Sequence, residues 1–290
     1  MARNSSSTLN VGSEYAFGVF LLVASAVTFS TAGLFTKGVA AGAWAVIFWR
    51  GVFAMLATTA WAASRSSLKK EFIGMGAAGL AVAVVGAAGQ VAFISSFKLT
   101  SVANVALIYA VAPILAALMA WLTIRERVGR QTMICAAVAF LGVGVVVSGS
   151  VGSLNLRGDF LALAMTMVMA GIMVIYRAHP NTPSAGPSVL QSALLLPFAV
   201  VFGEPFRTDP GEIAILAVFG ILFAIASVTL AEGAKRVPSG QTALIGALET
   251  PLAPLFALLV LSEMPPTPTL LGGAIVFAAV LASMWKTSFR

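Results

Sequence analysis

Two groups of five apolar segments follow one another along this chain, and the second group repeats the first at a nearly constant offset. Equivalent positions lie 137 residues apart in the later part of each group and 140 apart in the earlier part. The pairs are Lys98 with Lys235, Asn104 with Gln241, Glu126 with Glu263, Gly18 with Gly158, Phe20 with Phe160, Leu21 with Leu161, and Lys37 with Arg177. Because five is an odd number, the second copy must cross the membrane in the inverted sense. Inverted repeats are the architecture of alternating-access transporters, whose site lies near the midplane where the copies meet.

The segments are too apolar for the core of a soluble protein. Charged residues make up 9% of the chain, against roughly 25% in soluble domains. Hydrophobic residues make up 59%, and the mean hydropathy is +0.99. Since a span needs roughly 17–25 apolar residues and a backbone in lipid must satisfy its own hydrogen bonds, we predict an all-α integral membrane protein with ten transmembrane helices. The predicted spans are 15–35, 42–62, 73–97, 101–123, 131–149, 159–177, 188–203, 212–233, 239–261 and 268–285.

The repeat also defines the domain organisation. Residues 1–14 are predicted to form a polar cytoplasmic tail, 15–149 the first five-helix repeat, 150–158 a linker, 159–286 the second, inverted five-helix repeat, and 287–290 a second cytoplasmic tail. The loops between spans are short and rich in turn residues. None of them is long enough to be a soluble domain.

The distribution of lysine and arginine predicts the orientation, because cytoplasmic loops carry an excess of both. With the N-terminus in the cytoplasm, twelve of these residues fall on that side and four on the other. The twelve are Arg3, Arg65, Lys69, Lys70, Arg125, Arg127, Arg130, Arg177, Lys235, Arg236, Lys286 and Arg290; the four are Lys37, Lys98, Arg157 and Arg207. We therefore expect both termini in the cytoplasm of a multi-pass protein of the bacterial inner membrane.

Several function classes find no support in the residues. The only cysteine, Cys135, lies in an apolar span, and the only histidine, His179, lies in a proline-rich loop, so a His/Cys metal cluster is excluded. No phosphate-binding loop of the form G-x-x-x-x-G-K-[ST] is present, which argues against an ATP-driven pump in this chain. The net charge of +7 belongs to loops rather than to a basic face with aromatics. We expect no enzyme activity, cofactor, metal or nucleic-acid partner.

Two ionisable residues, Arg50 and Glu249, lie inside predicted spans. A charge at mid-bilayer costs at least ~2.5–3.5 kcal/mol, so each needs a partner or a water-filled cavity. Glu249 can be a proton-coupling carboxylate or a ligand for a substrate ammonium group. It can equally stabilise a helix break or pair with a basic group. For Arg50 we favour a structural role, since its long side chain can reach the interface.

Prolines interrupt the fourth and ninth spans at matching places. Pro113 corresponds to position 250, one residue before Pro251, and Pro254 follows. Proline removes a backbone donor and kinks a helix, and paired interruptions point to the site of a transporter. The same kinks can also simply shape the bundle. Pro113, Pro251 and Pro254 are therefore candidate gating kinks.

Polar and aromatic side chains in the same spans are candidates for binding substrate. Amides such as Gln90, Asn104 and Gln241 can bind a polar solute or form interhelical hydrogen bonds worth only ~0.6 kcal/mol each. Aromatic side chains can line a cavity or pack against lipid and neighbouring helices. The full set of candidates is Trp49, Gln90, Phe93, Asn104, Tyr109, Gln241 and Glu249.

The chain resembles the drug/metabolite transporter superfamily, in its ten-helix EamA-type branch. The resemblance is carried by Ala106-Leu-Ile-Tyr-Ala-Val-Ala-Pro113 with Arg125-Glu126-Arg127 in the first repeat. The second repeat carries Ala247-Leu-Glu249-Thr-Pro251-Leu-Ala-Pro254 with Ser262-Glu263, and Arg50 sits where the branch usually has an arginine. The resemblance implies a basket of ten helices around a central cavity and transport of small metabolites. Within the branch, the chain looks most like YddG-type exporters of aromatic amino acids.

These observations lead to one expected function and several alternatives. We expect a secondary transporter that exports small metabolites, above all aromatic amino acids, by alternating access. The fourth and ninth helices would line the site with the third and eighth. The expected partners are the small-molecule substrate and the lipid bilayer, with proton coupling as an option and the oligomeric state open. The alternatives are a transporter of cationic drugs or nucleosides and a passive facilitator or channel.

Overall fold

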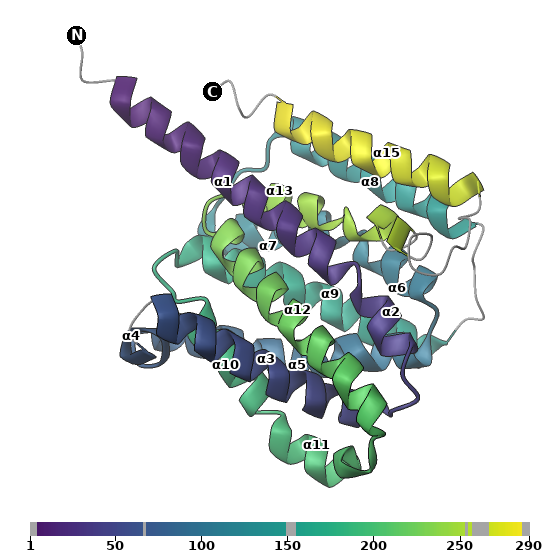
Figure 1. Ribbon diagram of the computed structural model, residues 1–290. Coiled ribbons are helices and arrows are strands. Elements are labelled where there is room, and N and C mark those ends of the chain that lie inside the picture. Colours follow the sequence, from purple (N-terminus) through teal and green to yellow (C-terminus); the bar gives the residue numbers. More distant parts are fainter. Residues whose placement is uncertain (1–4, 66–67, 149–154, 253–254, 257–266, 286–290) are drawn as a thin grey trace.

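The computed structural model describes residues 5–65, 68–148, 155–252, 255–256 and 267–285, and this part of the chain is helical with short connections (Figure 1). Within it, eight helical segments are long and apolar enough to cross a membrane, and a shorter apolar helix covers Arg130–Val146. The predicted ninth span begins in a helix at Ser239 and continues into residues outside the described part. The all-α prediction is confirmed, and the architecture agrees with ten transmembrane helices.

The first repeat contains eight helices, some of which are pieces of one span. They are α1 (Ser5–Phe29), α2 (Ala32–Lys37), α3 (Ala43–Arg65), α4 (Leu68–Phe72), α5 (Gly76–Leu99), α6 (Val102–Tyr109), α7 (Ala112–Ile124) and α8 (Arg130–Ser148). The first helix begins ten residues before the predicted start of the first span, so much of the polar N-terminal segment is helical as well.

The second repeat is built in the same order. Its helices are α9 (Leu156–Ala178), α10 (Ala185–Ala193), α11 (Leu196–Phe202), a 3₁₀ turn at Pro205–Arg207, α12 (Pro210–Ala234), α13 (Ser239–Gly246) and α15 (Thr267–Trp285), with further helical residues at 249–252. Polar caps start several of them. Asn155 accepts a hydrogen bond from the Gly158 N–H at 3.1 Å, and Asp209 accepts one from the Gly211 N–H at 2.7 Å.

The helix interruptions in the fourth and ninth spans fall at equivalent positions. The first lies at residues 110–111, between α6 and α7, and the second at 247–248, after α13, again 137 residues apart. Pro113 lies in the first turn of α7, where its missing N–H costs nothing, but its ring prevents the helix from continuing unbroken from α6. The two interruptions meet, because the Tyr109 hydroxyl lies 3.3 Å from where a Cβ of Gly246 would be.

Two other interruptions have no counterpart in the opposite repeat. Residues 194–195 separate α10 from α11, which has Pro197 in its first turn. Residues 30–31 separate α1 from α2 without any proline. There, the hydroxyls of Thr28, Ser30 and Thr31 each donate to a backbone carbonyl three or four residues earlier, at 2.6–2.7 Å. Such bonds compete with the helical ladder and bend it. The predicted continuous span 15–35 is thus divided.

Packing runs between the repeats more than within them. Each of α1 and α3 packs along α12, α5 packs along α9, and α8 pairs with α15. Figure 1 shows the α8–α15 pair side by side at one edge of the bundle. Glycine permits the closest approaches: a Cβ at Gly220 would lie 2.6 Å from the carbonyl oxygen of Arg50, and α12 therefore touches the backbone of α3. Figure 1 also shows that α1 begins and α15 ends at the same end of the bundle.

Candidate functional site

A cavity lies in the middle of the bundle, between helices of both repeats. Its walls come from α3, α5, α9, α10 and α12, with one side chain from α1. The lining residues are Phe29, Arg50, Val82, Gly86, Gly89, Gln90, Phe93, Met165, Val168, Met169, Ile172, Tyr176, Ser188, Gln191, Phe223, Ser227 and Leu230. Aromatic, methionine and branched side chains dominate this set. Such a cavity suits an apolar or aromatic group held by a few polar contacts.

Arg50 is the one charged residue in the described part of the lining. It is fully buried, and its Nη2 donates to the Gln90 side-chain oxygen at 2.5 Å. Its guanidinium carbon lies 4.0 Å from the centre of the Phe223 ring and 5.4 Å from that of Phe219, so two aromatic faces contact the cation. Within the described part of the chain, Nε and Nη1 have no hydrogen-bond partner. The guanidinium is therefore held in place, while the N–H donors of Nε and Nη1 are not used by the described residues.

Uncharged polar groups surround this cation. The Gln90 side-chain nitrogen donates to the Ser192 hydroxyl of α10 at 3.4 Å. Gln191, also on α10, lies against α5, because its side-chain oxygen occupies the space that a Cβ of Gly86 would need. Ser188 and Ser227 complete the polar part of the wall. No aspartate or glutamate belongs to the lining, and no cluster of metal-ligating side chains occurs among the described residues.

Three of the residues singled out from sequence meet in this cavity: Gln90, Phe93 and Arg50. Trp49, on the helix of Arg50, lies elsewhere. Its indole N–H donates to the Pro205 carbonyl at 2.8 Å, and its ring packs on Phe53. The structure thus places Trp49 at a contact between α3 and the 3₁₀ turn.

The other two amides make interhelical hydrogen bonds outside the cavity. The Asn104 side-chain nitrogen donates to the Thr100 hydroxyl at 3.2 Å and to a carboxylate oxygen of Asp159 at 3.5 Å. The Gln241 side-chain nitrogen donates to the Ser283 carbonyl at 3.0 Å, and its oxygen accepts from the Tyr15 hydroxyl at 3.3 Å. Both side chains connect helices that are distant in sequence.

Tyr109 and Glu249 lie where the two helix interruptions meet. Tyr109 is buried, and its hydroxyl has no hydrogen-bond partner among the described residues. Glu249 is half-buried and belongs to the short helical stretch that follows the interruption after α13. It is close enough to Tyr109 for its charge to act on that side chain. Pro251 is buried in the same short stretch, whereas Pro254 and Glu263 fall outside the described part of the chain. Tyr109, Glu249 and Pro251 do not line the cavity.

Sequence reasoning missed the contribution of the seventh span. Ser188 and Gln191 lie in the predicted span 188–203, three residues apart and thus on one face of a helix. That spacing was available in the sequence, since both are polar within an apolar run. Ser227 is likewise a polar residue in an apolar run, the predicted eighth span. The predicted candidates come instead from the second, third, fourth and ninth spans.

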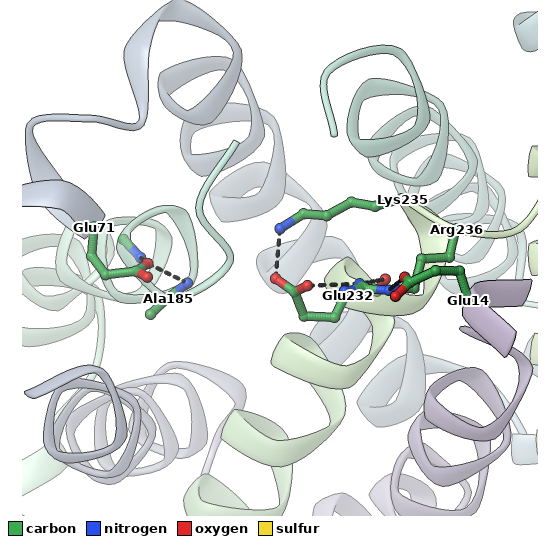
Figure 2. A network of polar contacts seen from close by, with 7 residues as sticks. Glu14, Glu71, Ala185, Glu232, Lys235 and Arg236 are labelled. Atoms are coloured by element: carbon green, nitrogen blue, oxygen red, sulfur yellow. Dashed lines mark hydrogen bonds and ion pairs between the residues drawn. The ribbon is translucent and has the colours of Figure 1, made fainter. Parts of the chain in front are cut away.

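The end of the bundle where α1 begins is closed by a network of charges (Figure 2). Glu232 of α12 accepts hydrogen bonds from Lys235 at 2.6 Å and from Arg236 at 2.8 Å, and Arg236 also donates to Glu14 of α1 at 2.9 Å. The Lys235 ammonium lies 5.6 Å from the ring centre of Tyr176, which lines the cavity. The network therefore lies directly next to the cavity.

Two further carboxylates strengthen the closure at this end. Glu71 of α4 accepts from the backbone N–H groups of Ala185 and Gly186, at the start of α10, at 3.1 and 3.4 Å (Figure 2). Glu126 accepts from Arg177 at 3.0 Å and from the N–H of Ser239 at 2.9 Å. Glu71, in the short helix α4, and Glu126, in the loop after α7, thus each join the first repeat to a helix end of the second.

Hydrogen bonds also hold the opposite end together. Lys37 donates to the Thr100 carbonyl at 3.0 Å, and the Thr100 hydroxyl donates to Asp159 at 2.8 Å. Lys98 donates to the Val39 carbonyl at 2.8 Å, and Glu212 accepts from the backbone N–H groups of residues 40 and 41 at 2.5 and 3.1 Å. The cavity is thus bounded by polar contacts at both ends.

Comparison with known proteins identifies the same pattern twice in the chain. The model of the EamA-like transporter family matches residues 16–148 and again residues 156–285. No curated protein matches the sequence. Among 29 matching chains of solved structures, one titled only "Crystal structure of protein" superimposes with a TM-score of 0.76 at 18% identity, over 92% of this chain and 98% of the other. That likeness shows the fold.

Proposed function

This chain belongs to the EamA-like transporter family, and from that premise we propose that it exports small metabolites, specifically aromatic amino acids, by alternating access. The observation that carries the proposal is the central cavity between the two repeats. Its walls offer Phe29, Phe93 and Phe223 for an aromatic ring, and Arg50 with Gln90 for polar groups. Sites of this composition orient a largely apolar ligand through a few polar contacts.

The closures at the two ends support alternating access. In a carrier, one end must open while the other stays shut. The network of Glu14, Glu232 and Arg236 joins α1 to α12, and the contact of Lys37 with Thr100 joins α2 to the end of α5. We propose that these two sets of contacts break in turn. An open pore would need no such pairs at both ends, which disfavours the channel alternative.

The charge of the cavity weighs against a cationic cargo. Among the described residues, Arg50 is the single charged residue of the lining, and no carboxylate belongs to it. A cation in the cavity would meet a like charge in a medium of low polarity, where repulsion is strong. Transport of cationic drugs therefore fits this site less well than transport of amino acids.

Counterflow in proteoliposomes tests the proposal. Vesicles with purified protein are loaded with unlabelled phenylalanine, tryptophan or threonine, and entry of the labelled amino acid is followed over time. We expect a transient overshoot that is larger for phenylalanine and tryptophan than for threonine, because the cavity wall is aromatic. Uptake no greater than in protein-free liposomes for all three would refute amino-acid transport. Linear, non-saturating uptake without an overshoot would favour a facilitator.

A further inference from the structure

We propose that Arg50 is the group that binds the substrate carboxylate, and that the site recognises aromatic carboxylates whether or not they carry an ammonium group. The inference deepens the proposed function and rests on it only in placing the solute in this cavity. It reverses the structural role that the sequence favoured for Arg50.

The first argument is the unpaired charge. A buried cation is expensive unless it is paired and hydrogen-bonded. Gln90 is neutral and takes one of the five N–H donors of Arg50, whereas Nε and Nη1, which carry three, have no partner among the described residues. The aromatic contacts stabilise the faces of the guanidinium and leave its edge free. A planar oxyanion supplies both the charge and the acceptors that this edge lacks.

The second argument is that no competing carboxylate occurs among the described residues of the cavity wall. The groups that face Arg50 are the Phe219 and Phe223 rings of α12 and the Gln90 amide of α5, with Ser192 of α10 behind it. All of them are uncharged. A structural arginine in a bundle is normally paired with an acid or with backbone carbonyls. Here the wall provides neither, and the counter-charge must come with the ligand.

The third argument is the asymmetry of the wall for the two ends of an amino acid. The lining offers a full positive charge for a carboxylate but only neutral acceptors, such as Ser227 and Gln191, for an ammonium group. In a medium of low polarity, an ion pair between guanidinium and carboxylate is stronger than a hydrogen bond between an ammonium group and a neutral acceptor. Binding should therefore depend strongly on the carboxylate and weakly on the ammonium group.

In the present conformation the guanidinium is sealed from solvent. Arg50 has no exposed surface, and the Phe223 ring covers it at 4.0 Å. Because Arg50 has no exposed surface, a carboxylate can reach Nε and Nη1 only after part of the cavity wall moves, and a shift of α12, which carries both rings, would provide such a movement. The C-terminal end of α12 carries Glu232, which belongs to the charge network next to the cavity. A shift of α12 would thus both open that end and expose Arg50.

A series of three ligands on the unmodified protein provides the test. Phenylalanine has both charged groups, 3-phenylpropionate lacks the ammonium group, and phenethylamine lacks the carboxylate. Calorimetric titration of the purified full-length protein measures the affinity for each. We expect 3-phenylpropionate to bind within a few-fold of phenylalanine and phenethylamine to bind about 10- to 100-fold more weakly, as for loss of a charged hydrogen bond. Equal binding of all three, or binding of none, would overturn the proposal.

The matched variants are Arg50→Gln and Arg207→Gln. Each removes one arginine, but Arg207 is exposed on the 3₁₀ turn, where its side chain is 79% accessible. We expect Arg50→Gln to lose the preference for carboxylates and Arg207→Gln to keep it. A preference that persists in a folded Arg50→Gln protein would refute the role of Arg50. Should that variant fail to fold, the ligand series on the unmodified protein still decides whether binding requires the carboxylate.

The outcomes separate this inference from the proposed function. Arg50-dependent binding of 3-phenylpropionate without counterflow of any amino acid would uphold the carboxylate site and refute amino-acid export. Counterflow of phenylalanine that phenethylamine inhibits as well as 3-phenylpropionate does would uphold export and refute the carboxylate site.

Discussion

Asn104 and Gln90 are both buried amides in transmembrane helices, yet they have different kinds of partner. Asn104 donates to Thr100 and Asp159, which themselves form a hydrogen bond, so the amide completes a contact between α6, the end of α5 and the start of α9. Gln90 accepts from a charged residue in the wall of the cavity. The hydrogen bonds of Asn104 hold helices together, whereas the hydrogen bond of Gln90 orients the Arg50 guanidinium, which has further N–H donors.

Substitution of Asn104 should therefore affect stability rather than binding. We expect Asn104→Ala to lower the free energy of unfolding by about 0.6–1.7 kcal/mol, the range for interhelical hydrogen bonds in a membrane protein, and to leave the affinity for phenylalanine unchanged. Unfolding in detergent and titration of the same preparation measure the two quantities. Weakened binding with unchanged stability would place Asn104 in the site after all.

At the residue scale, the sequence identified which side chains are unusual but not where they point. Gln90, Asn104 and Gln241 were equivalent candidates, because each is an amide in an apolar helix. Only the rotation of each helix in the bundle separates Gln90, in the cavity wall, from the other two. Ser188 and Gln191 were missed for the same reason, since nothing in the sequence shows which face of the seventh span turns towards the cavity.

Among the elements, the paired interruptions were the most predictable feature. Pro113 and Pro251 made a break foreseeable in each of the fourth and ninth spans, because proline acts through its own covalent geometry. The break between α1 and α2 was not foreseeable in this way. It depends on three hydroxyls that bond to carbonyls of the preceding turn, and serine and threonine also occur in unbroken helices.

The interruption at Pro113 should matter for turnover. We expect Pro113→Ala to straighten the connection between α6 and α7 and to slow counterflow several-fold without lowering expression, because the two interruptions meet at Tyr109 and Gly246. Pro210→Ala is the matched control, since Pro210 begins α12 and breaks no helix. Unchanged counterflow in Pro113→Ala would show that this interruption shapes the bundle and takes no part in gating.

For the whole molecule, the closures at the two ends make a prediction about access. In a Cys135→Ala background, Glu14→Cys with Arg236→Cys replaces an ion pair between α1 and the end of α12 by a site for a short bifunctional thiol reagent. We expect cross-linking to abolish counterflow, because it locks this end shut.

The control uses the ion pair of Glu204 with Arg207, which is local and exposed. Cysteines at those two positions should cross-link without loss of counterflow. Full activity of the cross-linked Glu14→Cys/Arg236→Cys protein would mean that the end where α1 begins does not open during transport.

The pairing of α8 with α15 has a consequence for how the protein is made. These helices are the last of their repeats, and each packs mainly against the other. A ribosome releases α8 into the membrane long before α15 has been synthesised. Until then, the face of α8 that holds Gly142, where α15 will approach the backbone, is open to lipid or to insertion factors. The first repeat therefore lacks its main packing partner for α8 until the final helix has been synthesised.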